Sequence, residues 1–164
     1  MPTHIVLGKT SGTFGRVWLT IVIVFTASLL PGSAAATLGG DMESVDRDQS
    51  VLNASQQIAA STQSFTVYEL RPATGAVVRE YLSLAGNVFA VAWKGTVPPD
   101  LRQILGASFG RYAEAAQRLH GGHGHLSIRR QDLVVESNGQ RKAFFGRAYL
   151  PQALPPDIDV DDLH

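Results

Sequence analysis

The chain of 164 residues contains no cysteine. Without cysteine it cannot form a disulfide, bind a metal through thiolates or carry a lipid on a cysteine near its N-terminus. Its stability must therefore come from packing and hydrogen bonding alone.

The sequence also lacks an excess of charge of either sign, because 14 Lys and Arg residues balance 14 Asp and Glu residues. A nucleic-acid-binding surface needs a strongly basic face, and no basic stripe is present along this chain. We therefore expect no nucleic-acid partner. After residue 36, no apolar run approaches the ~20 residues of a membrane-spanning helix.

What the sequence does contain is a segment, residues 1–36, with the three parts of a secretory signal peptide. Its start carries two basic residues and no acid, and an uncharged apolar run extends over 17–30. As a helix this run would be about 21 Å long, shorter than the ~30 Å core of a bilayer. Pro31-Gly32 then breaks the helix, and Ala34-Ala35-Ala36 offers small residues to a peptidase.

This segment predicts export by general secretion, with cleavage between Ala36 and Thr37 or one or two residues earlier. The alternative, an uncleaved anchor, is disfavoured by the short apolar run. Cleavage leaves twelve bases against fourteen acids, a net charge of −2. We expect one domain over 37–150, a tail over 151–164, and a periplasmic or extracellular location without a lipid anchor or a membrane span.

Two stretches have the features of helices. The first covers 41–58, with a thin apolar stripe and an N-cap at Asp41 or Ser44. The second begins at Pro98-Pro99-Asp100, and apolar residues recur at helical spacing as far as Leu119.

Five stretches are predicted to be strands, because they alternate in polarity or are rich in β-branched and aromatic residues. They are residues 65–70, 77–84, 88–94, 126–136 and 141–150. Short connections predict that the first three form an antiparallel meander, and Asn138-Gly139 predicts a type I′ turn between the last two. Alternation places Phe89, Val91 and Trp93 on one face, and we expect Trp93 to anchor the core.

The predicted fold class is therefore α+β. We expect an antiparallel sheet of about five strands, in the order meander, helix, hairpin, with one or two helices on one side. Residues 59–64 are expected to be a linker, and the acidic residues 151–164 an extended and mobile tail.

One pattern suggests a hydrolase. The segment 106–110 reads Gly-Ala-Ser-Phe-Gly and matches the G-x-S-x-G motif, in which the serine stands on a strained turn between a strand and a helix. Here Ser108 falls inside a predicted helix, where Gly106 and Gly110 are best explained as small packing residues. We expect no catalytic residue, and a small hydrolase that uses Ser108 is the disfavoured alternative.

A second pattern suggests a metal site, because His120, His123 and His125 lie within six residues. Imidazoles bind transition metals, but this spacing matches no established closed site, and the intervening glycines raise the entropic cost of ordering the loop. We favour a solvated loop with no metal or other cofactor. A periplasmic metal-binding protein that uses these three histidines is the alternative.

Acidic and basic residues also share the predicted strands: Glu69, Glu80, Glu136, Arg79, Arg130 and Arg147. Two carboxylates that face one cleft can perform acid–base chemistry. Cross-strand Glu–Arg pairs are the commoner use of such residues, and we favour that interpretation.

Several segments also carry a resemblance to a known family. They are 38–41 (Leu-Gly-Gly-Asp), 77–81 (Val-Val-Arg-Glu-Tyr), 88–93 (Val-Phe-Ala-Val-Ala-Trp), 99–106 (Pro-Asp-Leu-Arg-Gln-Ile-Leu-Gly), 132–137 (Asp-Leu-Val-Val-Glu-Ser) and 145–151 (Phe-Gly-Arg-Ala-Tyr-Leu-Pro). In these the chain resembles a group of short exported proteobacterial proteins classed only as a domain of unknown function. The resemblance implies a Gram-negative source, export and one domain, but no catalytic residue, cofactor or substrate.

From export, one domain and no coherent catalytic set, we expect a non-catalytic envelope protein. Its partner would be an envelope protein or a glycan, bound through the face of the sheet or an edge strand.

Overall fold

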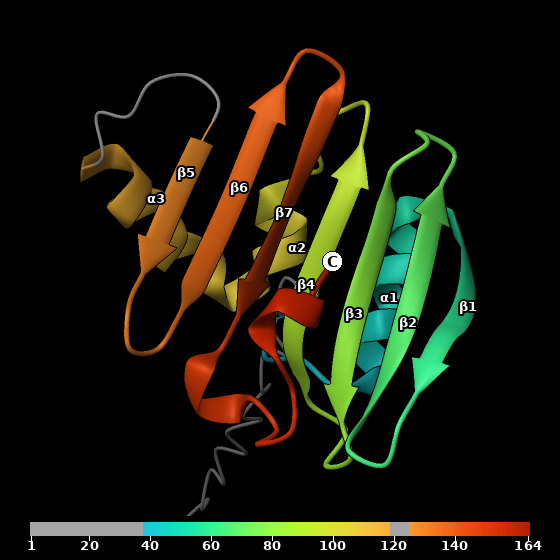
Figure 1. Ribbon diagram of the computed structural model, residues 1–164. Helices are drawn as coiled ribbons and strands as arrows, with labels where there is room; N and C mark the ends of the chain where they lie inside the picture. Colours follow the sequence, from blue (N-terminus) through green and yellow to red (C-terminus); the bar gives the residue numbers. More distant parts are fainter. Residues whose placement is uncertain (1–37, 119–124) are drawn as a thin grey trace, which may run out of the picture. The chain divides into compact units, whose positions relative to one another are not determined.

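A single antiparallel sheet of seven strands organises residues 38–118 and 125–164, which are the residues that the computed structural model describes (Figure 1). The strands lie in the order β1-β2-β3-β4-β7-β6-β5. Their bounds are Ala54–Ser61 (β1), Phe65–Pro72 (β2), Val77–Ser83 (β3), Val88–Gly95 (β4), His125–Arg129 (β5), Val134–Gln140 (β6) and Ala143–Tyr149 (β7). The α+β class and the meander that includes β2, β3 and β4 are thus confirmed, but the sheet has two more strands than predicted.

Helix α1 (Met42–Leu52) begins where the sequence predicts. The carboxylate of Asp41 accepts a hydrogen bond from the backbone N–H of Ser44 at 3.0 Å and so caps the helix. The prediction that this helix continues to residue 58 is wrong. Asn53 adopts the left-handed conformation (φ 46°) and ends α1, and the following residues pair with β2 as the edge strand β1.

The second predicted helix is broken into α2 (Leu101–Leu105), a 3₁₀ turn, η1 (Gly106–Ser108), and α3 (Phe109–Arg118). The break falls at Gly106, whose φ of 49° is one that glycine adopts without strain. At the start of α2, the carboxylate of Asp100 accepts a hydrogen bond from the backbone N–H of Arg102 at 2.9 Å. The prediction of this helix start is confirmed, and the prediction of one continuous helix is wrong.

The predicted strand over 126–136 is two strands, β5 and β6, joined by a turn in which the N–H of Arg130 donates to the carbonyl of Leu133 at 2.9 Å. The predicted type I′ turn at Asn138-Gly139 is also wrong. These residues lie inside β6, where Gly139 pairs with Phe144. The hairpin turns instead at Arg141 and Lys142, and only Lys142 has a positive φ (61°).

The helices pack on one face of the sheet, as predicted. Their apolar residues form one core cluster with inward-facing strand residues, and Trp93, only 4% exposed, belongs to it. Phe89 lies on the opposite face, so the prediction that it shares a face with Val91 and Trp93 is wrong. The cause is a bulge in β4: Tyr81 pairs with Ala90 and Leu82 pairs with Val88, which leaves Phe89 as the extra residue.

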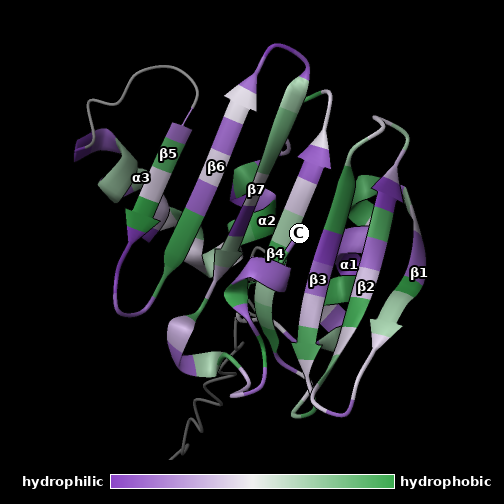
Figure 2. Cartoon of the chain, in the orientation of Figure 1, coloured by the Kyte–Doolittle hydropathy of each residue, from purple (hydrophilic) through white to green (hydrophobic). Residues whose placement is uncertain are grey.

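The opposite face is partly covered by the C-terminal residues, which contain the 3₁₀ turns η2 (Pro151–Ala153) and η3 (Val160–Asp162). Leu163 is 2% exposed in a second core cluster with Val67, Tyr81 and Phe89. The expected extended, mobile tail is therefore a packed segment. Polar and apolar residues alternate along most strands (Figure 2), as expected of a sheet with one face in a closed core and the other partly in contact with solvent. Within the described residues, no helix is long and apolar enough to cross a membrane.

Candidate functional site

The face of the sheet opposite the helices carries a row of polar side chains in direct cross-strand register. Strand pairing aligns, from β1 to β5, Gln57, Glu69, Arg79, Ala92, Arg147, Glu136 and Ser127. Residues paired in this way point to the same side of the sheet. A glutamate and an arginine therefore lie on each side of the small residue Ala92.

Glu69 is the most enclosed charged member of the row, at 2% exposed. The Nε of Arg79 donates to its Oε2 at 2.8 Å, and the Nη2 of Arg71 lies 2.6 Å from its Oε1. Burial alone would raise the pKa of Glu69, but hydrogen bonds and positive charge from Arg79 and Arg71 outweigh burial and lower the pKa below 4.5. Glu69 is therefore an ionised carboxylate at neutral pH.

Glu136 repeats this arrangement on the other side of Ala92. The Nε of Arg147 donates to its Oε2 at 2.8 Å, and the Nη2 of Arg129 donates to its Oε1 at 2.6 Å. Burial again acts to raise the pKa of Glu136, and the two arginines again lower it below its ordinary value. The predicted cross-strand Glu–Arg pairs are thus present for Arg79 and Arg147.

The other predicted members of this set lie elsewhere. Arg130 lies 3.7 Å from the carboxylate of Asp132 within the β5–β6 turn. Glu80 is buried and lies two residues from Val78 and from Leu82, so it shares their helix-covered face. The three glutamates therefore do not converge on one cleft.

The two inner arginines of the row also hold the C-terminal segment over Ala92. Arg79 donates from Nη1 to the backbone oxygen of His164, and Arg147 donates from Nη1 to the carbonyl of Val160. The hydroxyl of Tyr81 donates to the same His164 oxygen at 3.2 Å and accepts from the His164 N–H at 3.1 Å. These contacts fix the path of the segment across the sheet.

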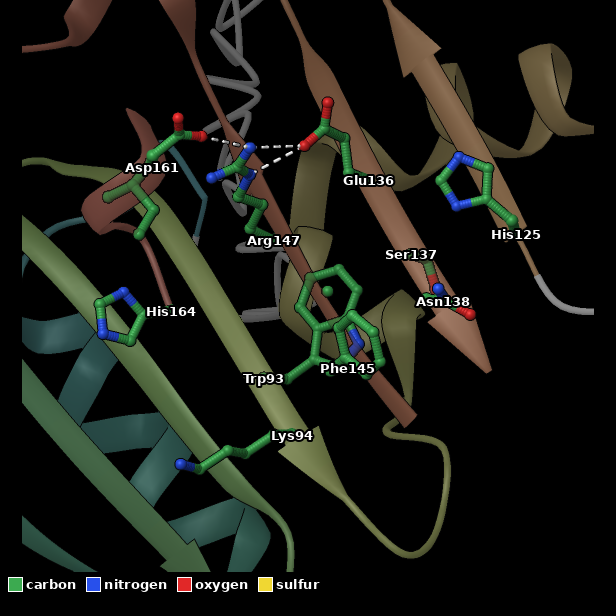
Figure 3. Close-up of a pocket in the computed structure, with 12 residues that line it drawn as sticks. Trp93, Lys94, His125, Glu136, Ser137, Asn138, Phe145, Arg147, Asp161 and His164 are labelled. Atoms are coloured by element: carbon green, nitrogen blue, oxygen red, sulfur yellow. Dashed lines mark hydrogen bonds and ion pairs between the residues drawn. The ribbon is translucent and has the colours of Figure 1, made fainter. Parts of the chain in front are cut away.

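A groove of about 410 Å³ lies beside this segment, over β4, β7 and β6 (Figure 3), and we name it the tail-side groove. Its lining residues are Trp93, Lys94, His125, Glu136, Ser137, Asn138, Phe145, Gly146, Arg147, Asp161, Leu163 and His164. The ring of Phe145, 53% exposed, is the largest exposed apolar group of the groove. Strand pairing sets Lys94 on one side of it and Asn138, then His125, on the other.

Gly146 explains how the buried tryptophan packs beneath the groove. A Cβ at this position would lie 2.5 Å from Cζ2 of Trp93 and 2.4 Å from the carbonyl oxygen of Glu136. The indole therefore packs directly against the backbone of β7 on the helix-covered face, whereas Phe145 points to the groove on the other face.

The charges of the groove are unevenly paired. Arg147 is bound to Glu136 and lies 3.3 Å from Asp161. Burial acts to lower the pKa of Arg147, but these two carboxylates raise it above its ordinary value, so its charge is permanent. Among the charged residues of the lining, Lys94 is the one that makes no ion pair with any other described residue. The groove thus offers one uncompensated positive charge beside an exposed aromatic ring.

Ser108, the candidate nucleophile, lies outside the groove. It is 1% exposed, and its hydroxyl accepts a hydrogen bond from Nη2 of Arg111 at 2.7 Å. Its backbone forms a 3₁₀ turn between two helices rather than a turn from strand to helix. Arg111 also binds Asp132 at 2.6 Å, so Ser108 belongs to a contact that ties α3 to the β5–β6 turn.

Of the three histidine candidates, His120 and His123 lie outside the described residues. Ala36 and Thr37, at the predicted cleavage site, also lie outside them. His125 is exposed at the start of β5 and lines the tail-side groove. Over 38–118 and 125–164, no group of three His, Asp or Glu residues is arranged to hold a metal ion.

Lys94, Asn138, Phe145 and His164 were not predicted to share a site. Alternation along 141–150 does place Phe145 and Arg147 on one face. No pattern in the sequence, however, signals that residue 164 returns to lie beside residue 94.

The structure defines an α+β protein whose antiparallel sheet is covered by helices on one face and bears a partly covered groove on the other. A family model described as "Protein of unknown function (DUF2844)" matches residues 34–163, and the chain belongs to this family. The predicted resemblance to an uncharacterised family is thereby confirmed. Comparisons with curated proteins and with solved structures gave no match.

Proposed function

We propose that the protein is a non-catalytic binding protein of the cell envelope and that the tail-side groove is its ligand site. The observation that carries the proposal is an exposed aromatic ring within a concavity of about 410 Å³, surrounded by side chains of several polar types. Sites for small ligands commonly have about 300–1,000 Å³, an apolar floor and a few convergent polar groups.

The state of the acidic groups supports binding rather than catalysis. A general acid needs a proton near neutral pH, so its pKa must be raised. Arg79 and Arg147 instead lower the pKa values of Glu69 and Glu136 and occupy their oxygens. Both carboxylates are therefore suited to holding the sheet and the C-terminal segment in place.

Export is supported by the signal-peptide pattern of residues 1–36. Expression of the full chain in a Gram-negative host, followed by fractionation and N-terminal sequencing, tests this directly. We expect a product in the periplasm or the medium that begins at Thr37 or one or two residues earlier. A cytoplasmic product that retains residues 1–36 would contradict export.

The binding proposal is tested by screening the purified exported protein against saccharides, peptides and lipids taken from envelope material. Each ligand is then titrated against wild type, Phe145→Ala and Leu84→Ala. Leu84 is an exposed apolar residue outside the groove lining, so it controls for loss of surface apolar area. Ligand binding that Phe145→Ala weakens and Leu84→Ala does not is the expected result. Binding that neither change affects, or chemical conversion of the ligand, would contradict the proposal.

A further inference from the structure

The groups around Phe145 restrict the chemistry of the ligand. The exposed ring presents a flat apolar surface, and strand pairing puts a charged amine (Lys94), an amide (Asn138) and an imidazole (His125) in line with it. Figure 3 shows Lys94 and His164 on one side of the ring and Asn138 and His125 on the other. A suitable ligand needs one apolar face and polar groups along its edges.

Sugar rings have this form, because a pyranose can present a face of C–H groups while its hydroxyls point outward from the edge. We infer that the tail-side groove binds an acidic saccharide, that is, a sugar chain in which at least one ring carries a carboxylate. This inference rests on the proposed use of the groove as the ligand site. The C–H face lies on Phe145, hydroxyls bind Asn138 and His125, and the carboxylate pairs with Lys94.

The acidic group follows from charge complementarity. Glu136 and Asp161 together balance the charges of Arg147 and Arg129, so these four groups offer no strong net charge to a ligand. Lys94 has no carboxylate partner among the described residues and pairs in register with Phe145. A carboxylate on a sugar ring that stacks on Phe145 can reach the ammonium group while the ring keeps its place.

Two other ligand classes fit the groove less well. A wholly apolar ligand would remove water from Lys94 and Asn138 without replacing their hydrogen bonds, which is unfavourable. A peptide that adds a strand needs unpaired backbone groups at a sheet edge. Of the strands that line the groove, β4, β7 and β6 are each paired on both sides, and the edge strand β5 contributes only His125. Recognition here must therefore use side chains, as saccharide recognition does.

The test is calorimetric titration of the purified exported protein with oligomers of galacturonic, glucuronic and N-acetylneuraminic acid, each also supplied as its uncharged methyl ester. We expect at least one acid to bind and its ester to bind roughly fivefold more weakly. Lys94→Gln should weaken binding of the acid by a similar factor and leave the ester unaffected. The matched control is Lys142→Gln, which removes the same charge from an exposed turn outside the groove lining. It should bind as wild type does.

Loss of the ring gives a second, independent readout. Phe145→Ala should weaken acid and ester alike by roughly tenfold or more, and Phe145→Tyr, which keeps the ring, should restore most of the affinity.

Failure of all three acids to bind overturns the inference, as does equal binding of acid and ester. If a peptide, a lipid or a neutral sugar binds instead and Phe145→Ala abolishes it, the inference fails and the proposed function stands. Binding that is indifferent to Phe145 contradicts both.

Discussion

Gly146 is the residue that lets Trp93 pack against the strand beneath the groove. It has no side chain where β7 crosses Trp93, so the indole lies against the backbone of β7. The clash that a Cβ would cause involves a backbone oxygen, which cannot move without disturbing the pairing of β6 with β7. The need for glycine at this position could not be deduced from the sequence, because the contact with Trp93 depends on which strand pairs with β4.

Gly146→Ala should therefore destabilise the protein by about 1–3 kcal/mol, as overpacking of a filled core does. The matched control is Gly110→Ala in α3, where a Cβ meets no atom within 4 Å. That change should leave stability unchanged or raise it by up to about 1 kcal/mol, because alanine favours a helix. Urea unfolding of both variants and wild type measures the difference. Equal stability of the two variants would contradict the described packing.

Glu69 gives a prediction about pH. Its pKa in the folded protein is below 4.5, so its carboxylate stabilises the fold fully above pH 4.5. That contribution is lost as pH falls through the folded pKa. Glu69→Gln should cost about 1–3 kcal/mol at pH 7, because Arg79 and Arg71 lose a charged acceptor. The difference from wild type should shrink as the pH falls below 4.5.

Unfolding free energies measured from pH 7 to pH 3 check this. The control is Glu114→Gln, which breaks an exposed pair with Arg118 on α3 and should change stability at pH 7 by less than about 1 kcal/mol. A difference between wild type and Glu69→Gln that is constant over this range would rule out the ion pairs as its source.

At the scale of elements, local sequence signals located where the helices begin better than where helices and strands end. The Asp41 and Asp100 caps were recognisable because a cap involves only neighbouring residues. The end of α1 at Asn53 was missed, since Asn also occurs within helices and β1 is polar and largely exposed. The Asn138-Gly139 pair was misread as a turn because pairing with β7, a tertiary contact, holds it in β6.

The C-terminal segment is the element for which composition was most misleading. Its aspartates and prolines suggested disorder, yet one residue, Leu163, fills a site against Tyr81 and Phe89 while Arg79 and Arg147 bind the segment's backbone. This buried leucine, several hydrogen bonds and the partly buried Leu154, Ile158 and Val160 together outweigh the polarity of the segment.

Leu163→Ala should accordingly destabilise the protein by about 2–5 kcal/mol and speed hydrogen exchange in residues 157–164. Leu84→Ala is the same change at a residue 76% exposed and should stay within about 0.5 kcal/mol of wild type. Thermal unfolding and hydrogen–deuterium exchange report the two effects separately. A segment that exchanges as fast in wild type as in Leu163→Ala would show that it is not packed.

At the scale of the whole molecule, the sheet has two differently used faces. The face under the helices is a closed core, whereas the other is covered only where the C-terminal segment crosses it. The fold class and the packing of the helices on a single side of the sheet follow from sequence periodicity. The groove does not, because it is assembled from β4, β6, β7 and the end of the chain, which only the tertiary fold brings together.

The central claim is that this groove binds the ligand. An amide chemical-shift map of the isotope-labelled protein, recorded while the acidic oligosaccharide that binds most tightly is added, tests it most directly. If the ligand occupies the groove, the largest shifts fall on residues 93–94, 138, 145–147 and 161–164. Shifts confined to β1 or to the helix-covered face, or no shifts at all, would contradict it.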